Sequence, residues 1–514
     1  ESVLSLLLNV NFPRQGWNDV SFNGNDQIMT PNLDAMAYQG VILKQYYSEA
    51  ICTPARSSLL TGKYSMRTDL QLHIKGMASA PLTNSEDRGI PIKERLLPSY
   101  LKELGYSNHL VGKWHVGMSR NEYLPTFRGY DSHYGVRGGF ADYYTHNHVM
   151  VVIINNHNRS RPLFLHLAHT APHAGNEGAP LQPTRSTQTL RNKYIAHSDR
   201  RLYADMVTNL DDSFGEIIKA LEFNEMLDDT IIIFASDNGA PTVGFYRNWG
   251  VNLPLRGQKW TPWEGGVRVP AFIWHSSLKS KVWDGMFHVC DWLPTLIAAG
   301  GGEAPRDIDG INQWAELQNG LISKRNDILV SVDNVQHYAA YRYGNYKIVL
   351  GNMSNSYSPN GYYGRELLIT KLATPNYYLT IYSSKVAKIM ERRGRIYLPR
   401  IISNMREAIK IRQLDLKADE VPCLPTPRCL YNVRDDPLES HDLWNDTRQV
   451  ADLLAITLLK FWNEQIPRRK FIIDPKADPA RTGYVFLPWI DSGTPESMEP
   501  TPIQTLYYKE SNFG

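Results

Sequence analysis

Apolar runs of strand length alternate with helical patterns along the first 300 residues. The runs occur at residues 4–10, 109–114, 162–169 and 230–239. Apolar positions recur every three or four residues at 98–107 and 203–223, which predicts amphipathic helices. This alternation predicts a largely parallel sheet with helices on both faces. Ligands bind beyond the carboxyl ends of the strands in such sheets, so the polar residues that follow the strands are candidates for chemistry.

The pattern changes after about residue 345. Tyrosine, asparagine and basic residues become frequent there, and a helix-like stretch from Asp452 to Gln465 precedes a proline-rich tail. We therefore predict an α/β domain over residues 1–345 and a smaller α+β domain over residues 346–514. The length of 514 residues is sufficient for both.

Composition and charge narrow the class of protein. The chain is 42% hydrophobic and 21% charged, as is ordinary for a globular protein, and its net charge of +3 does not indicate nucleic-acid binding. No apolar run reaches the roughly 18 residues of a membrane span. The first residues, ESVLSLLL, lack a basic region and a small-residue cleavage site, so we expect a mature start or a first strand rather than a signal peptide.

Two of the four cysteines lie close together in the sequence. Cys423 and Cys429 flank LPTPR, a short proline-containing loop, and we predict a disulfide between them. Cys52 and Cys290 are left over, and we expect Cys290 to be a free thiol in the core. One local disulfide is weak evidence for an oxidising compartment.

Three N-glycosylation motifs support the same compartment. They begin at Asn158, Asn352 and Asn445, and each motif alone is a modest signal. Together with the cysteine pair they favour a secretory-pathway protein that is secreted or lysosomal.

The stretch ICTPARSSLLTGKY places Cys52 just before what resembles the first turns of a helix. A thiolate at a helix N-terminus near Arg56 would have a lowered pKa and be reactive. A buried, inert cysteine is the commoner role of a free thiol. The stretch alone leaves both interpretations open.

Other polar residues follow the predicted strands. Each alone is a weak signal, since a lone histidine or lysine at a strand end is more often a structural hydrogen-bonding group, and Asp-Asn-Gly alone predicts a turn. In this order, after the Cys-x-Pro-x-Arg motif, the set is far more specific. Its members are Lys113, His115, His169, His173, Asp237, Asn238 and Lys259.

With these residues the chain resembles the sulfatase family, particularly the animal arylsulfatases of the N-acetylgalactosamine-4-sulfatase (arylsulfatase B) type. The resemblance extends from near the N-terminus to beyond residue 440. It is carried by segments that include GWNDVSFNG, CTPARSSLLTGKY, GKWHVG, APHAG, SDNGAP, KWTPWEGGVRVPAF and LYNVRDDPLESHDL. The resemblance implies an alkaline-phosphatase-like α/β sandwich with a central, mostly parallel sheet and a smaller α+β C-terminal domain.

The resemblance also implies a chemistry for Cys52. In this family the motif cysteine is oxidised to formylglycine, an aldehyde, and the proline and arginine of the motif mark it for the modifying enzyme. One hydroxyl of the hydrated aldehyde attacks sulfur, and collapse of the diol then expels sulfate. A serine would be trapped as a stable sulfate ester.

The supporting roles carry over from the family by position. Arg56 would hold the formylglycine hydroxyls, and Lys113 and Lys259 would bind sulfate oxygens. His115 would accept a proton as the diol collapses, and His173 would protonate the leaving alcohol. His169 has no family role, and we expect a structural histidine.

The family also binds calcium, and here the chain departs from its pattern. Asp237 and Asn238 would supply oxygen ligands, together with the modified Cys52. Two adjacent aspartates normally precede the Gly-Trp pair, but counting back places Pro13 and Arg14 there, and counting along the strand places Val10 and Asn11. Neither count supplies a carboxylate. We therefore expect calcium to be weak or absent, with Asp237 paired to a basic residue such as Arg14, Lys113 or Lys259.

A second departure lies between the DYYTH and PLFLHLAH segments. The family usually has a longer connection there that includes a helix, whereas this chain has the short stretch NHVMVVIINNHNRSR.

The leading interpretation is hydrolysis of a sulfate ester on a sulfated carbohydrate or an aryl sulfate, weakened by the missing aspartates. The alternative is an inactive sulfatase-like protein that binds anions or serves in storage or interaction. Phosphatase activity is a third reading, which the Cys-x-Pro-x-Arg motif disfavours because those enzymes use Ser or Thr. The sequence predicts neither a nucleic-acid partner nor a membrane span, and leaves the oligomeric state and the exact substrate open.

Overall fold

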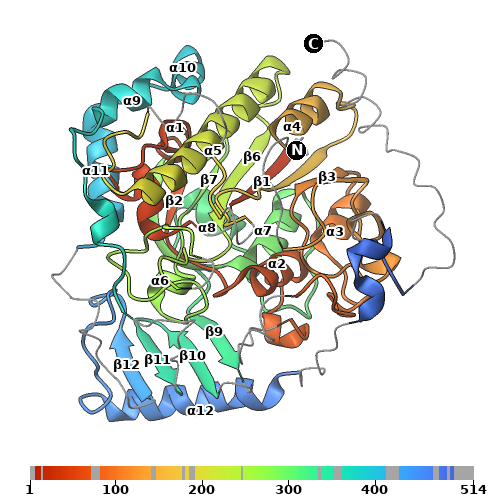
Figure 1. The fold of residues 1–514 in the computed structure, drawn as a ribbon, viewed down its shortest axis with the longest axis vertical. Helices are drawn as coiled ribbons and strands as arrows, with labels where there is room; N and C mark the ends of the chain where they lie inside the picture. The colour runs from red at the N-terminus through yellow and green to blue at the C-terminus, as the bar shows by residue number, and fades with distance from the viewer. Residues whose placement is uncertain are drawn as a thin grey trace.

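Two β-sheets organise the computed structural model of the chain (Figure 1). The structure describes residues 6–12, 15–70, 82–139, 146–175, 180–183, 191–244, 247–333, 337–351, 361–412, 428–466, 474–482 and 487–490.

The larger sheet has eight strands in the order β4-β3-β5-β1-β6-β7-β2-β8. Their bounds are Leu6–Phe12 (β1), Val41–Tyr47 (β2), Ser107–Gly112 (β3), Ser132–Tyr134 (β4), Leu163–Ala168 (β5), Thr230–Ser236 (β6), Ala271–Trp274 (β7) and Lys281–His288 (β8). Strand β7 is antiparallel to both of its neighbours, and the other pairs are parallel. The predicted mostly parallel sheet is confirmed, and each strand expected from the apolar runs is present.

Helices cover both faces of this sheet. Their bounds are Pro31–Ala37 (α1), Cys52–Thr61 (α2), Leu97–Glu103 (α3), His146–Asn155 (α4), Ser198–Phe223 (α5), Glu264–Val267 (α6), Trp292–Ala299 (α7), Trp314–Asn319 (α8), Tyr377–Ser383 (α9), Lys385–Arg392 (α10) and Pro399–Ile409 (α11). Helices α1, α4 and α5 share one core with the sheet, and α2, α3 and α7 share another. Helix α4 lies within the connection that is short for the family.

The alternation of side chains along the central strands produces these two cores. In β6, Ile232 and Phe234 pack into the core that contains α5, while Ile231 and Ile233 pack into the core that contains α2. Every residue of β6 is buried, which explains its continuous run of apolar, mostly β-branched residues.

The smaller sheet is antiparallel, in the order β12-β11-β10-β9, and helix α12 (Arg448–Glu464) packs against it (Figure 1). Its strands are Asp327–Asp333 (β9), Tyr338–Tyr343 (β10), Tyr346–Leu350 (β11) and Arg428–Asn432 (β12). Strands β9 and β10 precede residue 345 and the other two follow it. The proposed division of the chain at residue 345 therefore passes through this sheet, and the two domains stay a prediction.

A buried ionic cluster joins the two sheets through α6. The ammonium of Lys347 on β11 lies 3.0 Å from Glu264 Oε1 and 2.8 Å from Glu439 Oε1, and all three side chains are fully buried. The hydroxyl of Tyr47, at the end of β2, donates to Glu264 Oε2 at 2.6 Å. Charges withdrawn from water in this way require their partners, so the cluster ties the α6 segment to the small sheet.

The cysteines and glycosylation motifs agree with several predictions. Cys429 is disulfide-bonded, while its predicted partner Cys423 lies outside the described residues. Cys290 is a buried free thiol, as predicted. Asn158 and Asn445 have exposed side chains. The third motif asparagine, at position 352, also lies outside the described residues, and no described helix is long and apolar enough to cross a membrane.

Candidate active site

Cys52 is the first residue of α2, beyond the carboxyl end of β2, and its thiol is fully buried. The helix begins where Ile51 is extended and ends at Gly62, whose φ of 68° suits a left-handed cap. The sequence predicted a helix whose first turns follow Cys52, whereas α2 begins at Cys52 itself. The N-terminal end of a helix favours negative charge at residue 52.

Two lysines, Lys113 and Lys259, stabilise negative charge on the Cys52 sulfur. Lys259 Nζ lies 3.7 Å from Cys52 Sγ and also donates to Asn238 Oδ1 at 3.3 Å. Lys113 directly follows β3, and its backbone amide donates to Ala168 at the end of β5. Burial raises the pKa of the Cys52 thiol, but Lys113, Lys259 and then His115 outweigh burial and hold that pKa well below its usual value. The site therefore stabilises an anion at residue 52.

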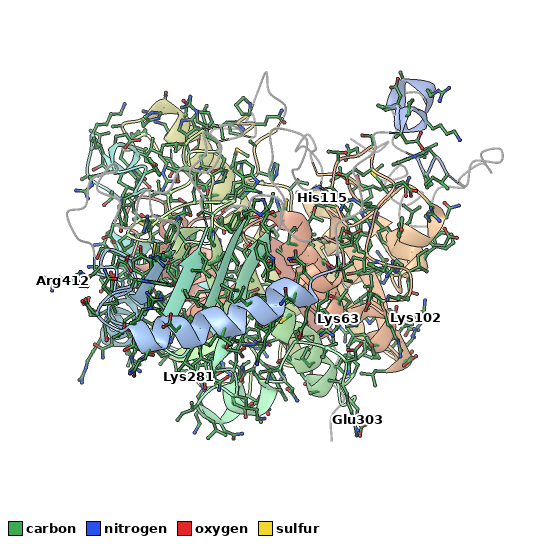
Figure 2. All side chains as sticks on the ribbon, turned by 90° about the horizontal axis from the view of Figure 1, so that it is seen from below. Lys63, Lys102, His115, Lys281, Glu303 and Arg412 are labelled. Carbon is green, nitrogen blue, oxygen red and sulfur yellow. The ribbon has the colours of Figure 1, made fainter. Side chains whose placement is uncertain are left out.

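His115 is held in a defined tautomer beside α2 (Figure 2). Its Nε2 lies 2.9 Å from the carbonyl oxygen of Leu82, so this nitrogen carries the hydrogen in the neutral ring. The other nitrogen, Nδ1, lies 3.4 Å from Thr53 Oγ1. Burial, followed by the charge of Lys113, lowers the pKa of His115 to about 4. A neutral ring with Nδ1 turned toward α2 is suited to accepting a proton there.

Two backbone features accompany this position of the His115 ring. His115 has a φ of 62°, in the left-handed region. A Cβ on Gly139 would lie 2.7 Å from His115 Nε2. Only glycine at position 139 leaves the imidazole room beside that segment.

Arg56 joins α2 to the ends of β3 and β6. Its guanidinium donates to the carbonyl oxygen of Lys113 at 2.8 Å and lies 3.3 Å from Asp237 Oδ2. Asp237 and Asn238 directly follow β6, and both are buried. The backbone of Asp237 is fixed by Ser48, whose hydroxyl donates to its carbonyl at 2.7 Å.

The register of β1 relates Asn11 to the strand that precedes Asp237. Asn11 pairs with Ala235 and Phe12 pairs with Ser236, so Asn11 lies two positions short of the level of Asp237. Pro13 and Arg14, which the other count selects, lie outside the described part of the chain, so both counts stay predictions.

The donors that the structure describes do not match calcium. No group of three or more His, Cys, Asp or Glu side chains suited to a metal gathers within the described residues. Asp237 faces Arg56, and Asn238 Oδ1 accepts from Lys259. The next acidic residue after β1 is Asp19, whose carboxylate is taken by Arg200 at 2.6 Å. One carboxylate and one amide fall short of the six to eight oxygens that Ca²⁺ prefers.

His173 lies on the loop after β5 and is buried. Its Nδ1 lies 2.6 Å from the carbonyl oxygen of Ala174. Asn248 connects this loop to the segment after Asp237. Its side-chain nitrogen donates to the carbonyl oxygen of Pro172 at 3.0 Å, and its backbone N–H donates to the carbonyl oxygen of Pro241 at 3.0 Å. His169 accepts a hydrogen bond from Ala171, a contact that suits a structural histidine.

The contacts thus bring together seven of the residues that the sequence singled out. They are Cys52, Arg56, Lys113, His115, Asp237, Asn238 and Lys259. The sequence analysis missed Thr53, Asn248 and the carbonyl of Leu82. No pattern in the sequence identifies a backbone carbonyl from a distant loop as the partner of an imidazole.

The chain is similar to known sulfatases. Residues 14–302 match the Sulfatase family. The chain is 33% identical to arylsulfatase J of Mus musculus, covering 92% of this chain and 78% of the relative. It is 29% identical to N-acetylgalactosamine-6-sulfatase of Mus musculus, covering 66% and 71%. The PsFucS1 sulfatase of Pseudoalteromonas sp. shares the fold, with a TM-score of 0.61 at 22% identity and coverage of 91% of both chains.

The family match covers more than half of the chain, and the relative at 33% identity extends across nearly all of it. The chain therefore belongs to the sulfatase family, whose reaction is the hydrolysis of sulfate esters.

Proposed function

We propose that the protein binds the sulfate group of a sulfated sugar or aryl sulfate at residue 52 and hydrolyses the ester slowly through a formylglycine. The observation that carries the proposal is the buried Cys52 at the start of α2, with Lys259 Nζ 3.7 Å from its sulfur. The structure holds the unmodified cysteine. A modifying enzyme would have to oxidise the thiol to the aldehyde.

Each step of the reaction has a residue suited to it. One hydroxyl of the hydrated aldehyde, ionised by release of its proton to solvent, attacks sulfur, and the ester oxygen leaves as the alcohol with a proton from His173. The second hydroxyl then gives its proton to Nδ1 of His115. The C–O bond to the sulfate breaks, sulfate departs and the aldehyde returns. Lys113 and Lys259 stabilise the charge on the sulfate oxygens during both steps.

The balance of charge limits this chemistry. Among the described residues, the buried pocket combines Arg56, Lys113 and Lys259 with one carboxylate, Asp237. A missing carboxylate at about 4 Å weakens the attraction for a cation by about 4 kcal/mol at an effective dielectric constant of about 20. We propose that the site favours anions over calcium, and no step above depends on a metal.

The same balance motivates a second candidate function. An inactive member of the family would keep the pocket as an anion-binding site without turnover. The excess of cations supports this alternative, because the pocket is suited to holding sulfate whether or not residue 52 is modified. Hydrolysis of phosphate esters is less well supported, since residue 52 is a cysteine.

The substrate class and the compartment are also proposals. The name N-acetylgalactosamine-6-sulfatase of one relative favours a sulfated sugar. The disulfide-bonded Cys429 and the exposed Asn158 and Asn445 support a secreted or lysosomal protein.

Mass spectrometry of the peptide that contains residue 52, from a source that carries the modifying enzyme, tests the nucleophile. Oxidation to formylglycine lowers the peptide mass, and Cys52→Ser is the matched control that cannot be converted. An intact thiol in all of the native protein would overturn the formylglycine proposal.

Assay of an aryl sulfate with and without added calcium tests the charge argument. We expect low activity that calcium does not raise in the native chain. We expect a marked gain, now calcium-dependent, in the double variant Pro13→Asp/Arg14→Asp. Full activity of the native chain, or tight calcium binding to it, would contradict the proposal.

A further inference from the structure

An open cleft of about 570 Å³ lies where the edge of the large sheet meets the C-terminal region. Strands β2 and β8 supply one wall through residues 44–45 and 284. The other walls come from residues 410–412, directly after α11, and residues 433–438, directly after β12. Arg412, which lines the cleft, lies at one side of the molecule, well away from His115 (Figure 2). The cleft is thus separate from the candidate active site.

Three exposed cations stand around this cleft. Ile411 and Val433 are buried, which turns their neighbours Lys410, Arg412 and Arg434 toward solvent. The side chains of these three cations make no hydrogen bond or ion pair to other described residues. Exposed charges without partners bind a ligand at a smaller desolvation cost than charges that must first leave a partner.

Two further cations lie in the wall of the cleft. Lys44 Nζ donates to the carbonyl oxygen of Ala408 at 2.8 Å, and Arg268 Nε donates to the carbonyl oxygen of Lys44 at 3.0 Å. Burial lowers the pKa of the Lys44 ammonium; Asp284 opposes this effect, and Arg268 and Arg434 add to it. The direction of that pKa is set mainly by burial, while Arg268 and Arg434 lie close enough to contribute to it.

The acidic residues of the cleft accept hydrogen bonds from nearby residues of the protein. Asp436 accepts hydrogen bonds from the hydroxyl of Ser440 at 2.9 Å and from the amides of Ser440 and His441 at 2.8 and 2.9 Å. Asp435 accepts from Asn432 at 2.8 Å, and Asp284 accepts from Gln45. These contacts fix the carboxylates in their loops but leave their charge in place, so the lining carries five cations against three carboxylates and keeps an excess of positive charge.

The chemistry of the lining narrows the partner. Its residues include no aromatic side chain on which a nucleic-acid base could stack. The apolar lining residues Ile411, Val433 and Leu438 are buried, so none is available to insert into a membrane. A linear polymer that carries sulfate or carboxylate groups on polar sugar rings needs neither feature.

We propose that this cleft binds a sulfated polysaccharide at a distance from residue 52, and that the substrate is therefore a polymer rather than a small aryl sulfate. The proposal rests on the proposed function for its choice of sulfated sugars. The cleft would hold one charged stretch of the chain while the active site takes a terminal or neighbouring sulfate group. Binding at two places raises the effective concentration of polymer at the active site.

The test is direct binding of chondroitin sulfate chains to the full-length protein at low salt. The variant is Lys410→Gln/Arg412→Gln/Arg434→Gln, which removes three charges from the cleft. The matched control is Lys193→Gln/Lys279→Gln/Lys460→Gln, which removes three exposed charges elsewhere. We expect the cleft variant to lose about tenfold or more in affinity and the salt dependence of log K to fall by about 2, while the control stays near the native value.

Because binding needs no turnover, this result is independent of whether residue 52 is modified or active. Equal losses in the cleft variant and the control would overturn the proposal, since they would indicate a general charge effect. A single-stranded oligonucleotide and vesicles containing phosphatidylserine serve as competing probes. If the cleft variant weakens either of these and leaves chondroitin sulfate unaffected, the proposal is also overturned.

Discussion

The ammonium of Lys259 lies 3.7 Å from the sulfur of Cys52 and 3.3 Å from the amide oxygen of Asn238. One side chain thus reaches both the candidate nucleophile and a candidate metal ligand. Its positive charge lies between these two groups. It follows that Lys259 governs how the pocket holds an anion.

Replacing Lys259 by methionine is expected to weaken the binding of inorganic sulfate. Removing one charge-assisted hydrogen bond costs about 1.5–3 kcal/mol, or a loss of about tenfold to a hundredfold in affinity. Titration calorimetry measures this without requiring turnover. Lys460→Met, on the exposed side of α12, is the control. Unchanged sulfate affinity in Lys259→Met would place the anion elsewhere.

The pH dependence of stability is expected to follow Asp211 on α5. Its buried carboxylate accepts hydrogen bonds from Asn32 and Leu33 at the start of α1. Burial raises the pKa of Asp211 to about 8, from 3.8, although these hydrogen bonds oppose the change. Between these two values the folded protein holds a proton that the unfolded chain has released. Stability therefore falls as pH rises, by about 1.4 kcal/mol per pH unit for this group.

Chemical denaturation between pH 5 and pH 8 measures this slope. Asp211→Asn imitates the protonated carboxyl and is expected to flatten the slope, whereas Asp212→Asn, at the neighbouring half-buried position, leaves it in place. A native protein that is more stable at pH 8 than at pH 5 would contradict the assignment.

The cysteines are expected to differ in their reaction with an alkylating reagent. Alkylation in denaturant without reductant should modify Cys290 alone in protein converted at residue 52, and both Cys52 and Cys290 in unconverted protein. Cys429→Ala should reduce stability by about 2 kcal/mol, the entropy of closing a loop of about six residues to Cys423. Labelling of Cys429 in the native protein before reduction would exclude the disulfide.

Glycosylation is expected at Asn445, which is exposed directly before α12. Asn445→Gln should remove one glycan and lower the mass of protein secreted from animal cells. Asn158 is also exposed and provides a second acceptor. A native mass equal to that of the bare chain would rule out both sites.

Much of the fold is encoded in local patterns. The continuous apolar run of β6 and the three-and-four spacing of α5 predict both elements, because a strand buried on both faces and an amphipathic helix each impose a simple periodicity. Helices α9 to α11 were not predicted individually. Helix α10 does place Val386, Ile389 and Met390 at helical spacing, so its pattern was present and was missed because the helix is short. Helices α9 and α10 are placed by packing against α1, far away in the sequence.

The candidate site also has a part that the sequence predicts and a part that it does not. Lys113 and Asp237 lie at the ends of predicted strands, so a parallel sheet predicts that they lie at the same edge. Strand β2, which precedes Cys52, was not predicted. The geometry of His115 could not be predicted, because its tautomer depends on the Leu82 carbonyl and on the space left by Gly139. These are contacts between segments with no shared pattern. The catalytic roles themselves stay predictions until the variants are measured.

The buried cluster of Glu264, Lys347 and Glu439 has a consequence for how this chain can be cut or recombined. The segment that carries Lys259 continues into α6, where Glu264 pairs with Arg268 of the same segment at 3.5 Å and with Lys347 of the small sheet at 3.0 Å. A fragment that stops before β9 would keep Glu264 and Arg268 but lose Lys347, and removing one partner from a buried ionic cluster is destabilising. An exchange of the C-terminal portion between relatives is therefore expected to leave the α6 segment in place only if Lys347 comes with it.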